Sequence, residues 1–201
     1  MNFTLEGADP RFAPLRRLLE QDGHNVGCES ENLITPPSEK RGVPYWADEI
    51  YTIQNAALTA EGAMELLMRR TDRSLMGMEV LVVGYGRIGS LLAPKLAALG
   101  AMVTVAARSP AARARAEAQG FRSVNITFIP AWFDAVVNTV PATVLEGDYG
   151  GALCLDLASA PGGWPKGEPV LHAVGLPGTY APQTAAEVMR DAIYRTVKER
   201  E

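Results

Sequence analysis

Residues 80–89 read Val-Leu-Val-Val-Gly-Tyr-Gly-Arg-Ile-Gly, an apolar run that leads into three glycines at dinucleotide-binding spacing. The apolar run is typical of a buried strand, and the apolar residues that follow share one face of a helix: Ile88, Leu91, Leu92, Leu96 and Leu99. In such a motif Gly84 permits a tight turn, Gly86 lets the backbone approach a pyrophosphate, and Gly89 lets the helix pack closely on the strand. The motif therefore predicts pyrophosphate binding at the helix N-terminus. The alternative is a strand-turn-helix unit that binds no nucleotide.

The segments after this motif alternate between strand and helix patterns, as in a parallel sheet. Further strands are predicted at Met102–Ala106, Ala135–Asn138, Ala152–Leu157 and Val170–Val174, and helices at 88–99, Pro110–Gln119 and Pro182–Lys198. Pro94 falls inside the first helix, where it removes the hydrogen bond to the carbonyl of Ser90 and favours a kink. We expect an α/β fold with a Rossmann-like, doubly wound parallel sheet.

The residues before the motif predict a small α/β part. Strands are expected at Asn2–Glu6 and His24–Cys28, a helix after Asp9-Pro10, an irregular loop over 29–46, and a second helix at Ala60–Arg70. We therefore expect three parts. These are a truncated N-terminal, substrate-side part over 1–58, a connector helix over 59–76, and a nucleotide-binding domain over 77–201 that includes the C-terminal helix.

Composition argues against several classes of partner. A net charge of −4 with 21 % charged residues gives no basic footprint for nucleic acid. No apolar run approaches the ~20 residues of a membrane span, and residues 1–20 contain no signal-peptide core. We expect a cytoplasmic protein without a nucleic-acid or membrane partner. Cys28 and Cys154 lie far apart, outside any metal-ligand motif, so we expect neither a disulfide nor a metal site.

The end of the second predicted strand indicates which coenzyme the glycine motif binds. An NAD-selective site places an acidic residue about 20 positions beyond the glycines, but no Asp or Glu occurs between Gly89 and Glu117. The strand ends instead at Arg108-Ser109, and a guanidinium beside a hydroxyl suits a 2′-phosphate. We therefore expect NADP. The alternative is NAD, with Arg108 an ordinary surface residue of a loop.

Polar residues follow the later strands, at the edge where ligands of open α/β sheets bind. Thr139, before Val140 and Pro141, is placed to contact the nicotinamide half, and Ser159 is a candidate substrate donor beyond Asp156. The loop Gly175, Leu176, Pro177, Gly178 and the later Thr184 precede the last helix, whose free amides suit a carboxylate or carboxamide. Each of these residues is also explained as part of a turn or cap.

Three residues are candidates for catalysis: Glu61, Ser159 and His172. Imidazole suits general acid–base chemistry, although the sequence assigns His172 no partner. Glu61 and the preceding Thr59 are equally explained as the first turn and cap of the helix over 60–70. A dicarboxylate would need a cationic receptor, for which Lys40, Arg41 and Arg87 are candidates.

Several short segments also occur together in a characteristic order. They are Thr59–Gly62, Thr71-Asp72 with Met76-Gly77, Val83–Gly89, Ala98–Ala101 with Ala107–Ser109, Asn138–Pro141, Leu155–Ser159 with Pro161–Gly163, and Gly175–Gly178 with Ala181-Pro182 and Thr184-Ala185. In these segments, over about residues 55–190, the chain resembles the A-type subunits of dipicolinate synthase. The resemblance implies an NADP-linked oxidation of a dihydrodipicolinate-type cyclic dicarboxylate to dipicolinate, a spore component. It also implies a second, flavoprotein-like partner, the B-type subunit of dipicolinate synthase.

The resemblance also implies residue roles. Those for the coenzyme fall on Gly84, Gly86, Gly89, Arg108, Ser109, Thr139 and Pro141, and those near substrate on Ser159 and Gly175–Gly178. To the coenzyme set we add the neighbouring Tyr85, Arg87, Ile88 and Val140, and to the substrate side we add Thr184.

The front of the chain departs from that family's pattern, because only about 55 residues precede the matched region and the family carries a fuller N-terminal α/β domain. We therefore expect an N-terminally shortened member. A small first part leaves apolar surface to be covered, so we also expect a homodimer. The main alternative is a non-catalytic NAD(P)-binding regulatory or scaffold protein. A dehydrogenase of a hydroxy or enol acid is a further alternative, by fold analogy alone.

Overall fold

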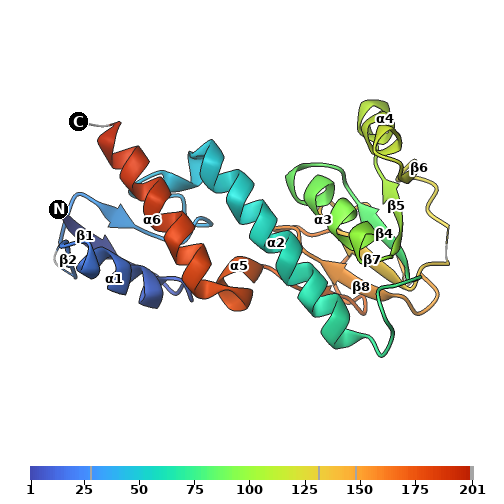
Figure 1. Ribbon diagram of the computed structural model, residues 1–201, viewed down its shortest axis with the longest axis horizontal. Coiled ribbons are helices and arrows are strands. Elements are labelled where there is room, and N and C mark those ends of the chain that lie inside the picture. Colours follow the sequence, from blue (N-terminus) through green and yellow to red (C-terminus); the bar gives the residue numbers. More distant parts are fainter. Residues whose placement is uncertain (28, 131, 148, 200–201) are drawn as a thin grey trace. The chain divides into compact units, whose positions relative to one another are not determined.

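The computed structural model describes residues 1–27, 29–130, 132–147 and 149–199, and the chain forms two compact units (Figure 1). The first unit combines Met1–Leu58 with Pro177–Glu201, and the second is the continuous stretch Thr59–Leu176. Among the described helices, none has the length and apolar character needed to cross a membrane.

The second unit contains a six-stranded, all-parallel sheet in the order β6-β5-β4-β7-β8-β9. Its strands are β4 (Glu79–Val83), β5 (Met102–Ala106), β6 (Arg122–Val124), β7 (Ala135–Asn138), β8 (Leu153–Asp156) and β9 (Leu171–His172). Counted along this unit, the order is 3-2-1-4-5-6, which is that of a dinucleotide-binding Rossmann sheet. The prediction of an α/β, Rossmann-like fold is confirmed.

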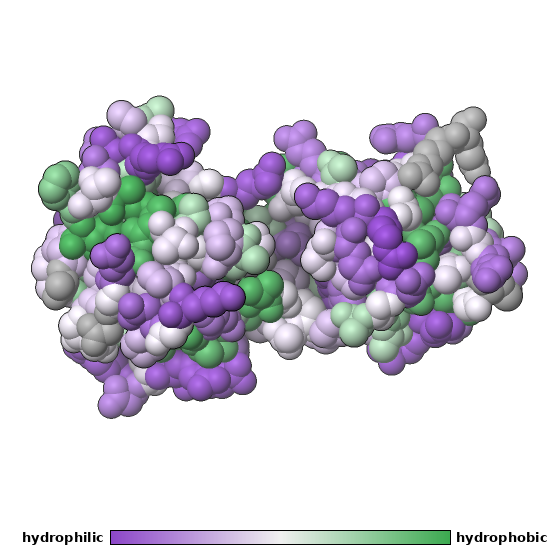
Figure 2. All heavy atoms as spheres, turned by 180° about the vertical axis from the view of Figure 1, so that it is seen from behind, coloured by the Kyte–Doolittle hydropathy of each residue, from purple (hydrophilic) through white to green (hydrophobic). Residues whose placement is uncertain are grey.

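The two faces of this sheet are covered differently. Val80 and Val82 of β4 pack in a core formed with α2 (Glu49–Arg70), α3 (Arg87–Ala98) and α4 (Pro110–Ala118). Leu81 and Val83 point to the opposite face, because side chains alternate along a strand. There they pack with residues of loops, including Phe133, Leu145 and Trp164. No helix occurs in the described parts of the connections after β7 and β8, so loops cover this face of the sheet. Figure 2 shows hydrophobic residues at the surface of this unit.

The first unit contains a small parallel sheet in the order β2-β1-β3. Its elements are β1 (Asn2–Leu5), α1 (Phe12–Gln21), β2 (Asn25–Val26), β3 (Leu33–Ile34), the 3-10 turn η1 (Tyr45–Ala47) and the C-terminal helix α6 (Pro182–Lys198). Helices α1 and α6 lie side by side (Figure 1). Phe3, Leu15 and Leu19 share one core with Met189 and Ile193 of α6.

This packing corrects the expected domain division, which placed the C-terminal helix in the nucleotide-binding domain. The apolar face of α6 is the predicted one, but it packs in the first unit. Helical periodicity defines which face of a helix is buried and says nothing about the element that covers it.

Other differences concern short elements and helix ends. The structure adds β3 within the expected loop, β6, and the helix α5 (Leu176–Tyr180), all too short to show a periodic pattern. Helix α2 begins at Glu49, well before the predicted Ala60, and α3 continues through Pro94. The predicted strand His24–Cys28 is reduced to β2, and Cys28 itself lies outside the described residues.

Asp48 stabilises the first unit by joining the start of α2 to α6. Its carboxylate accepts hydrogen bonds from the backbone N–H of Tyr51 at 2.6 Å and from Nε and Nη2 of Arg195, both at 2.9 Å. These bonds from the Arg195 guanidinium hold the pKa of Asp48 below its usual range. Because the pKa is lower in the folded state, this stabilisation is complete above the unfolded-state pKa and is lost as the pH falls through the folded-state value.

We therefore expect Asp48→Asn to lower the free energy of unfolding by about 2 kcal/mol at pH 7. In urea unfolding at pH 7 and at acidic pH, the difference from the unsubstituted protein should shrink as the pH falls through the lowered pKa of Asp48, below which the carboxylate is protonated in both states. Arg195→Gln should have a similar effect and be non-additive with Asp48→Asn. A difference of the same size at both pH values would contradict this assignment.

Candidate coenzyme site

The first glycine of the motif makes the turn at the end of β4. Gly84 has a φ of +94°, a left-handed conformation that favours glycine, and its N–H donates to the carbonyl of Ala106 on β5. A Cβ at this position would lie 2.5 Å from Thr139 Oγ1 and 2.8 Å from Val140 Cγ2. The backbone of the turn therefore lies directly against Thr139 and Val140. A larger residue in place of Gly84 would displace them.

The other two glycines have different surroundings. Gly89, in the first turns of α3, faces the carbonyl oxygen of Gly84 so closely that no Cβ fits between them. Gly86 precedes α3 as its N-cap, and a Cβ there would meet no protein atom within 4 Å. The first N–H groups of a helix have no partner within it, so the space beside Gly86 faces free donors and the positive end of a helix dipole. This arrangement fits a pyrophosphate.

Strand register brings the predicted polar residues to the same edge. Val83, Asn138, Asp156 and His172 lie opposite one another across β4, β7, β8 and β9, each near the carboxyl end of its strand. Thr139 is attached to the end of β4, because its N–H and its hydroxyl donate to the carbonyl of Val83 at 2.9 and 2.8 Å. The glycine turn, Thr139 and the ends of β8 and β9 thus lie along one edge of the sheet, the edge at which open α/β sheets bind ligands.

Other predicted coenzyme residues vary in what they can offer. The side chain of Tyr85 is buried, and its hydroxyl donates to Gln119 Oε1 at 2.7 Å, so only its backbone is available to a ligand. Burial raises the pKa of this phenol. Ile88 packs against the core, whereas Arg87 and Pro141 are exposed.

The turn after β5 carries the two residues that the sequence assigned to a 2′-phosphate, Arg108 and Ser109. Arg108 is exposed, and within the described part of the chain its side chain has no hydrogen-bond or ion-pair partner. Ser109 is the N-cap of α4, and its Oγ accepts a hydrogen bond from the N–H of Ala112 at 3.4 Å. No carboxylate follows β5 before Glu117. The residues just after this strand can therefore donate hydrogen bonds to a ribose phosphate without a competing negative charge in the same segment.

A buried polar network organises the edge beside β7 and β8, in which Asp156 has the turn-stabilising role that the sequence allowed, together with a pairing to Asn138 that the sequence did not predict. Asn138 and Asp156 are both fully buried, and Asn138 Nδ2 donates to Asp156 Oδ1 at 2.8 Å. Asp156 also accepts from the N–H of Ala158 at 3.1 Å and of Gly163 at 2.7 Å. At Gly163 a Cβ would collide with the amide of Asn138. The loop over 157–163 is therefore folded closely over this pair. The burial of Asp156 is explained by the hydrogen bonds that hold this loop.

The catalytic candidates are not equally placed. Ser159 is exposed in the loop after β8. His172 is also exposed, with Nδ1 3.7 Å from Asp156 Oδ2, so its ring lies beside the buried carboxylate at the sheet edge. Glu61, in contrast, lies on α2 and forms an ion pair with Lys95 of α3 at 3.1 Å. Ser159 and His172 are thus at the predicted edge, and Glu61 is engaged on a helix surface.

The substrate-side residues are divided between the two units. Gly175 and Leu176 end the second unit, with Leu176 buried in its core, while Pro177, Gly178 and Thr184 belong to the first. Within the first unit Gly178 lies against Arg11, since a Cβ would be 3.4 Å from Arg11 Cγ.

The proposed cationic receptors also differ in their contacts. Arg41 donates to Glu6 Oε1 at 2.8 Å and to Glu39 Oε2 at 2.7 Å. Lys40, beside it, adopts a φ of +51° and is exposed.

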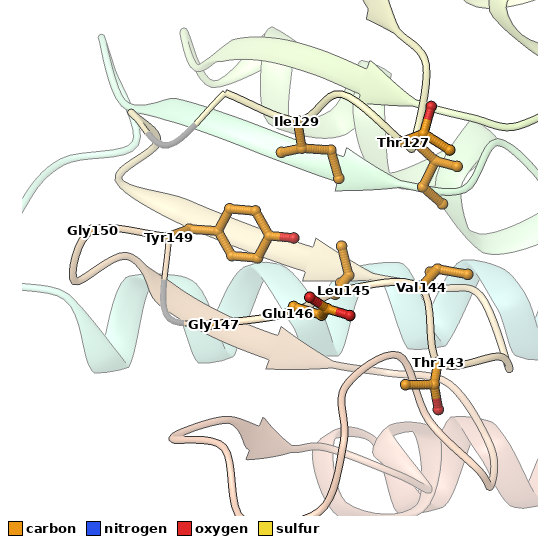
Figure 3. A pocket seen from close by; sticks show the side chains of 10 residues that line it. Thr127, Ile129, Thr143, Val144, Leu145, Glu146, Gly147, Tyr149 and Gly150 are labelled. Atoms are coloured by element: carbon orange, nitrogen blue, oxygen red, sulfur yellow. The ribbon is translucent and has the colours of Figure 1, made fainter.

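A separate pocket of about 650 Å³ lies on the loop-covered face of the sheet (Figure 3). Residues of the loops over 126–129, 143–147 and 149–150 line it, and the ring of Tyr149 points into it beside Glu146 (Figure 3). None of the residues predicted to bind coenzyme or substrate lines this pocket. This pocket is therefore distinct from the candidate coenzyme site at the carboxyl edge of the sheet.

Comparison with known proteins supports the nucleotide-binding assignment. Residues 52–146 match the family model described as the NAD-binding domain of D-isomer-specific 2-hydroxyacid dehydrogenases. The A-type subunit of dipicolinate synthase from Bacillus subtilis (strain 168) is 35 % identical in an alignment of 183 positions that covers 84 % of this chain and 61 % of that protein. The chain is similar in sequence to this dipicolinate synthase protein. It spans about three fifths of the length of that curated relative.

Solved structures agree with this relationship. The crystal structure of the same dipicolinate synthase component from Bacillus subtilis is 29 % identical, with a TM-score of 0.71 over 98 % of this chain and 64 % of that one. The corresponding crystal structure from Bacillus halodurans has a TM-score of 0.79 and covers 96 % of both chains. At 21 % identity, the second comparison shows a shared fold.

Proposed function

We propose that this protein is an NADP-dependent oxidoreductase that converts a dihydrodipicolinate-type cyclic dicarboxylate to dipicolinate. The observation that carries the proposal is the open space beside Gly86, at the N-terminus of α3 and at the carboxyl edge of a Rossmann sheet. The reaction class follows from the similarity to the A-type subunit of dipicolinate synthase. By the same similarity we propose the B-type subunit of a dipicolinate synthase as its partner.

In this proposal each part of the sheet edge has one task. The N-terminus of α3 binds the pyrophosphate, Arg108 and Ser109 bind the 2′-phosphate, and the turn Thr139–Pro141 orients the nicotinamide half. When bound, the coenzyme supplies the hydride acceptor, and the protein contributes binding, orientation and electrostatics. Ser159 and His172 remain the candidates for substrate contact and proton transfer, because both lie at the same edge of the sheet.

The proposal is tested by binding and turnover together. Calorimetry with NADP⁺ and NAD⁺ should show tighter binding of NADP⁺. A dihydrodipicolinate assay followed at the NADPH absorbance band, with and without a B-type partner, should show turnover. Arg108→Gln should weaken NADP⁺ binding by roughly tenfold and leave NAD⁺ within about twofold, because only NADP⁺ carries the 2′-phosphate. Arg115→Gln, on the helix that follows, is the matched control and should change neither affinity.

A second candidate is a nucleotide-binding protein without turnover. It is favoured by the contacts of Arg41, whose guanidinium is already engaged by Glu6 and Glu39 and so is not free to receive a dicarboxylate. Tight NADP⁺ binding without NADPH formation, with or without the B-type partner, would select this candidate.

A further inference from the structure

Arg113 makes an unusual contact with the turn that carries Arg108. Its Nη1 donates to the carbonyl of Ala107 at 2.8 Å and to the carbonyl of Arg108 at 2.9 Å. These two carbonyls belong to the residues directly after β5, and Arg113 is half-buried against them. The backbone from which the exposed Arg108 side chain projects is thereby attached to α4.

The position of Arg113 in α4 makes this contact informative. Helix α4 begins at Pro110 after the Ser109 cap, so Arg113 lies in its first turns, where the helix dipole disfavours a positive charge. The two carbonyl oxygens supply the negative partial charge that offsets this disadvantage. The two hydrogen bonds also occupy carbonyl oxygens whose negative partial charge would disfavour a phosphate nearby.

We propose that Arg113 is a positioning residue for coenzyme selectivity. By holding the Ala107 and Arg108 carbonyls, it directs the Arg108 guanidinium toward the 2′-phosphate and shields that phosphate from two carbonyl dipoles. The inference rests on the proposed use of NADP. In this inference, the preference for the 2′-phosphorylated coenzyme depends on Arg113, whose side chain does not have to touch the coenzyme.

The test compares dissociation constants for NADP⁺ and NAD⁺ by calorimetry, with thermal unfolding recorded for every variant. Arg113→Gln should weaken NADP⁺ binding by roughly tenfold and leave NAD⁺ binding within about twofold. Arg113→Lys keeps the charge but loses the fork of donors, so it should retain part of the preference. Arg115→Gln is the control, because residues two positions apart point to different sides of a helix.

The outcomes separate the two proposals. If Arg108→Gln removes the NADP⁺ preference and Arg113→Gln leaves it unchanged, the role of Arg113 is overturned and the coenzyme assignment stands. Equal weakening of both coenzymes by Arg113→Gln would show that Arg113 only maintains the turn, which also overturns the inference. A wild-type protein that binds both coenzymes equally would overturn both proposals.

Discussion

Gly86→Ala should reduce coenzyme affinity by roughly 100-fold while the protein stays folded. The backbone at Gly86 has a φ of −90°, which alanine adopts readily, and the added methyl group meets no protein atom within 4 Å. The only thing it displaces is a ligand on the N-terminus of α3. Calorimetry with NADP⁺ measures the loss, and thermal unfolding should show a midpoint close to that of the unsubstituted protein.

Gly89→Ala supplies the contrast within the same motif. Its methyl group would be forced into the carbonyl of Gly84, so α3 must move away from the end of β4. We expect a loss of about 3 kcal/mol in the free energy of unfolding, together with loss of coenzyme binding. Undiminished NADP⁺ binding by Gly86→Ala would sink the proposed coenzyme site, because that variant fills the open space beside Gly86 and leaves the protein interior unchanged.

Asp156→Ala should destabilise the second unit by about 4 kcal/mol, since it leaves three buried N–H donors without their acceptor. Those donors are the Asn138 amide and the backbone N–H groups of Ala158 and Gly163. Asp156→Asn retains one acceptor oxygen but turns its amide NH2 group toward an existing N–H donor. We therefore expect the free energy of unfolding to fall by about 2 kcal/mol.

Urea unfolding measures both substitutions at Asp156. The control is Asp72→Ala, an exposed carboxylate in the same unit, which should change stability by less than about 0.5 kcal/mol. If Asp156→Ala unfolded at the same urea concentration as this control, the network would not hold the loop over 157–163 as described.

The long, strongly patterned segments could be predicted from the sequence, and the contacts between them could not. The run Val80–Val83 and the helix after it are recognisable because both faces of the strand and one face of the helix are apolar. The pair Asn138–Asp156 depends on the register between two strands, which single-sequence patterns do not specify. A signal was present, however, because a polar residue ends each of these two buried strands.

The same contrast between local patterns and contacts between elements applies to the candidate site. Glycine spacing and the absent acidic residue after β5 are local features, so the turn and Arg108 were accessible from the sequence. Local sequence could not show the ion pair between Glu61 and Lys95 or the burial of the Tyr85 side chain. Both arise from packing between separate elements.

The insertion of the second unit within the sequence of the first has a consequence for synthesis on the ribosome. Thr59–Leu176 is continuous, so its core can close as soon as that stretch has emerged. Phe3, Leu15 and Leu19 are translated first, yet they must await α6, the last of these helices to leave the exit tunnel. These three apolar residues therefore stay uncovered while the whole second unit is synthesised, which makes them a natural target of chaperones.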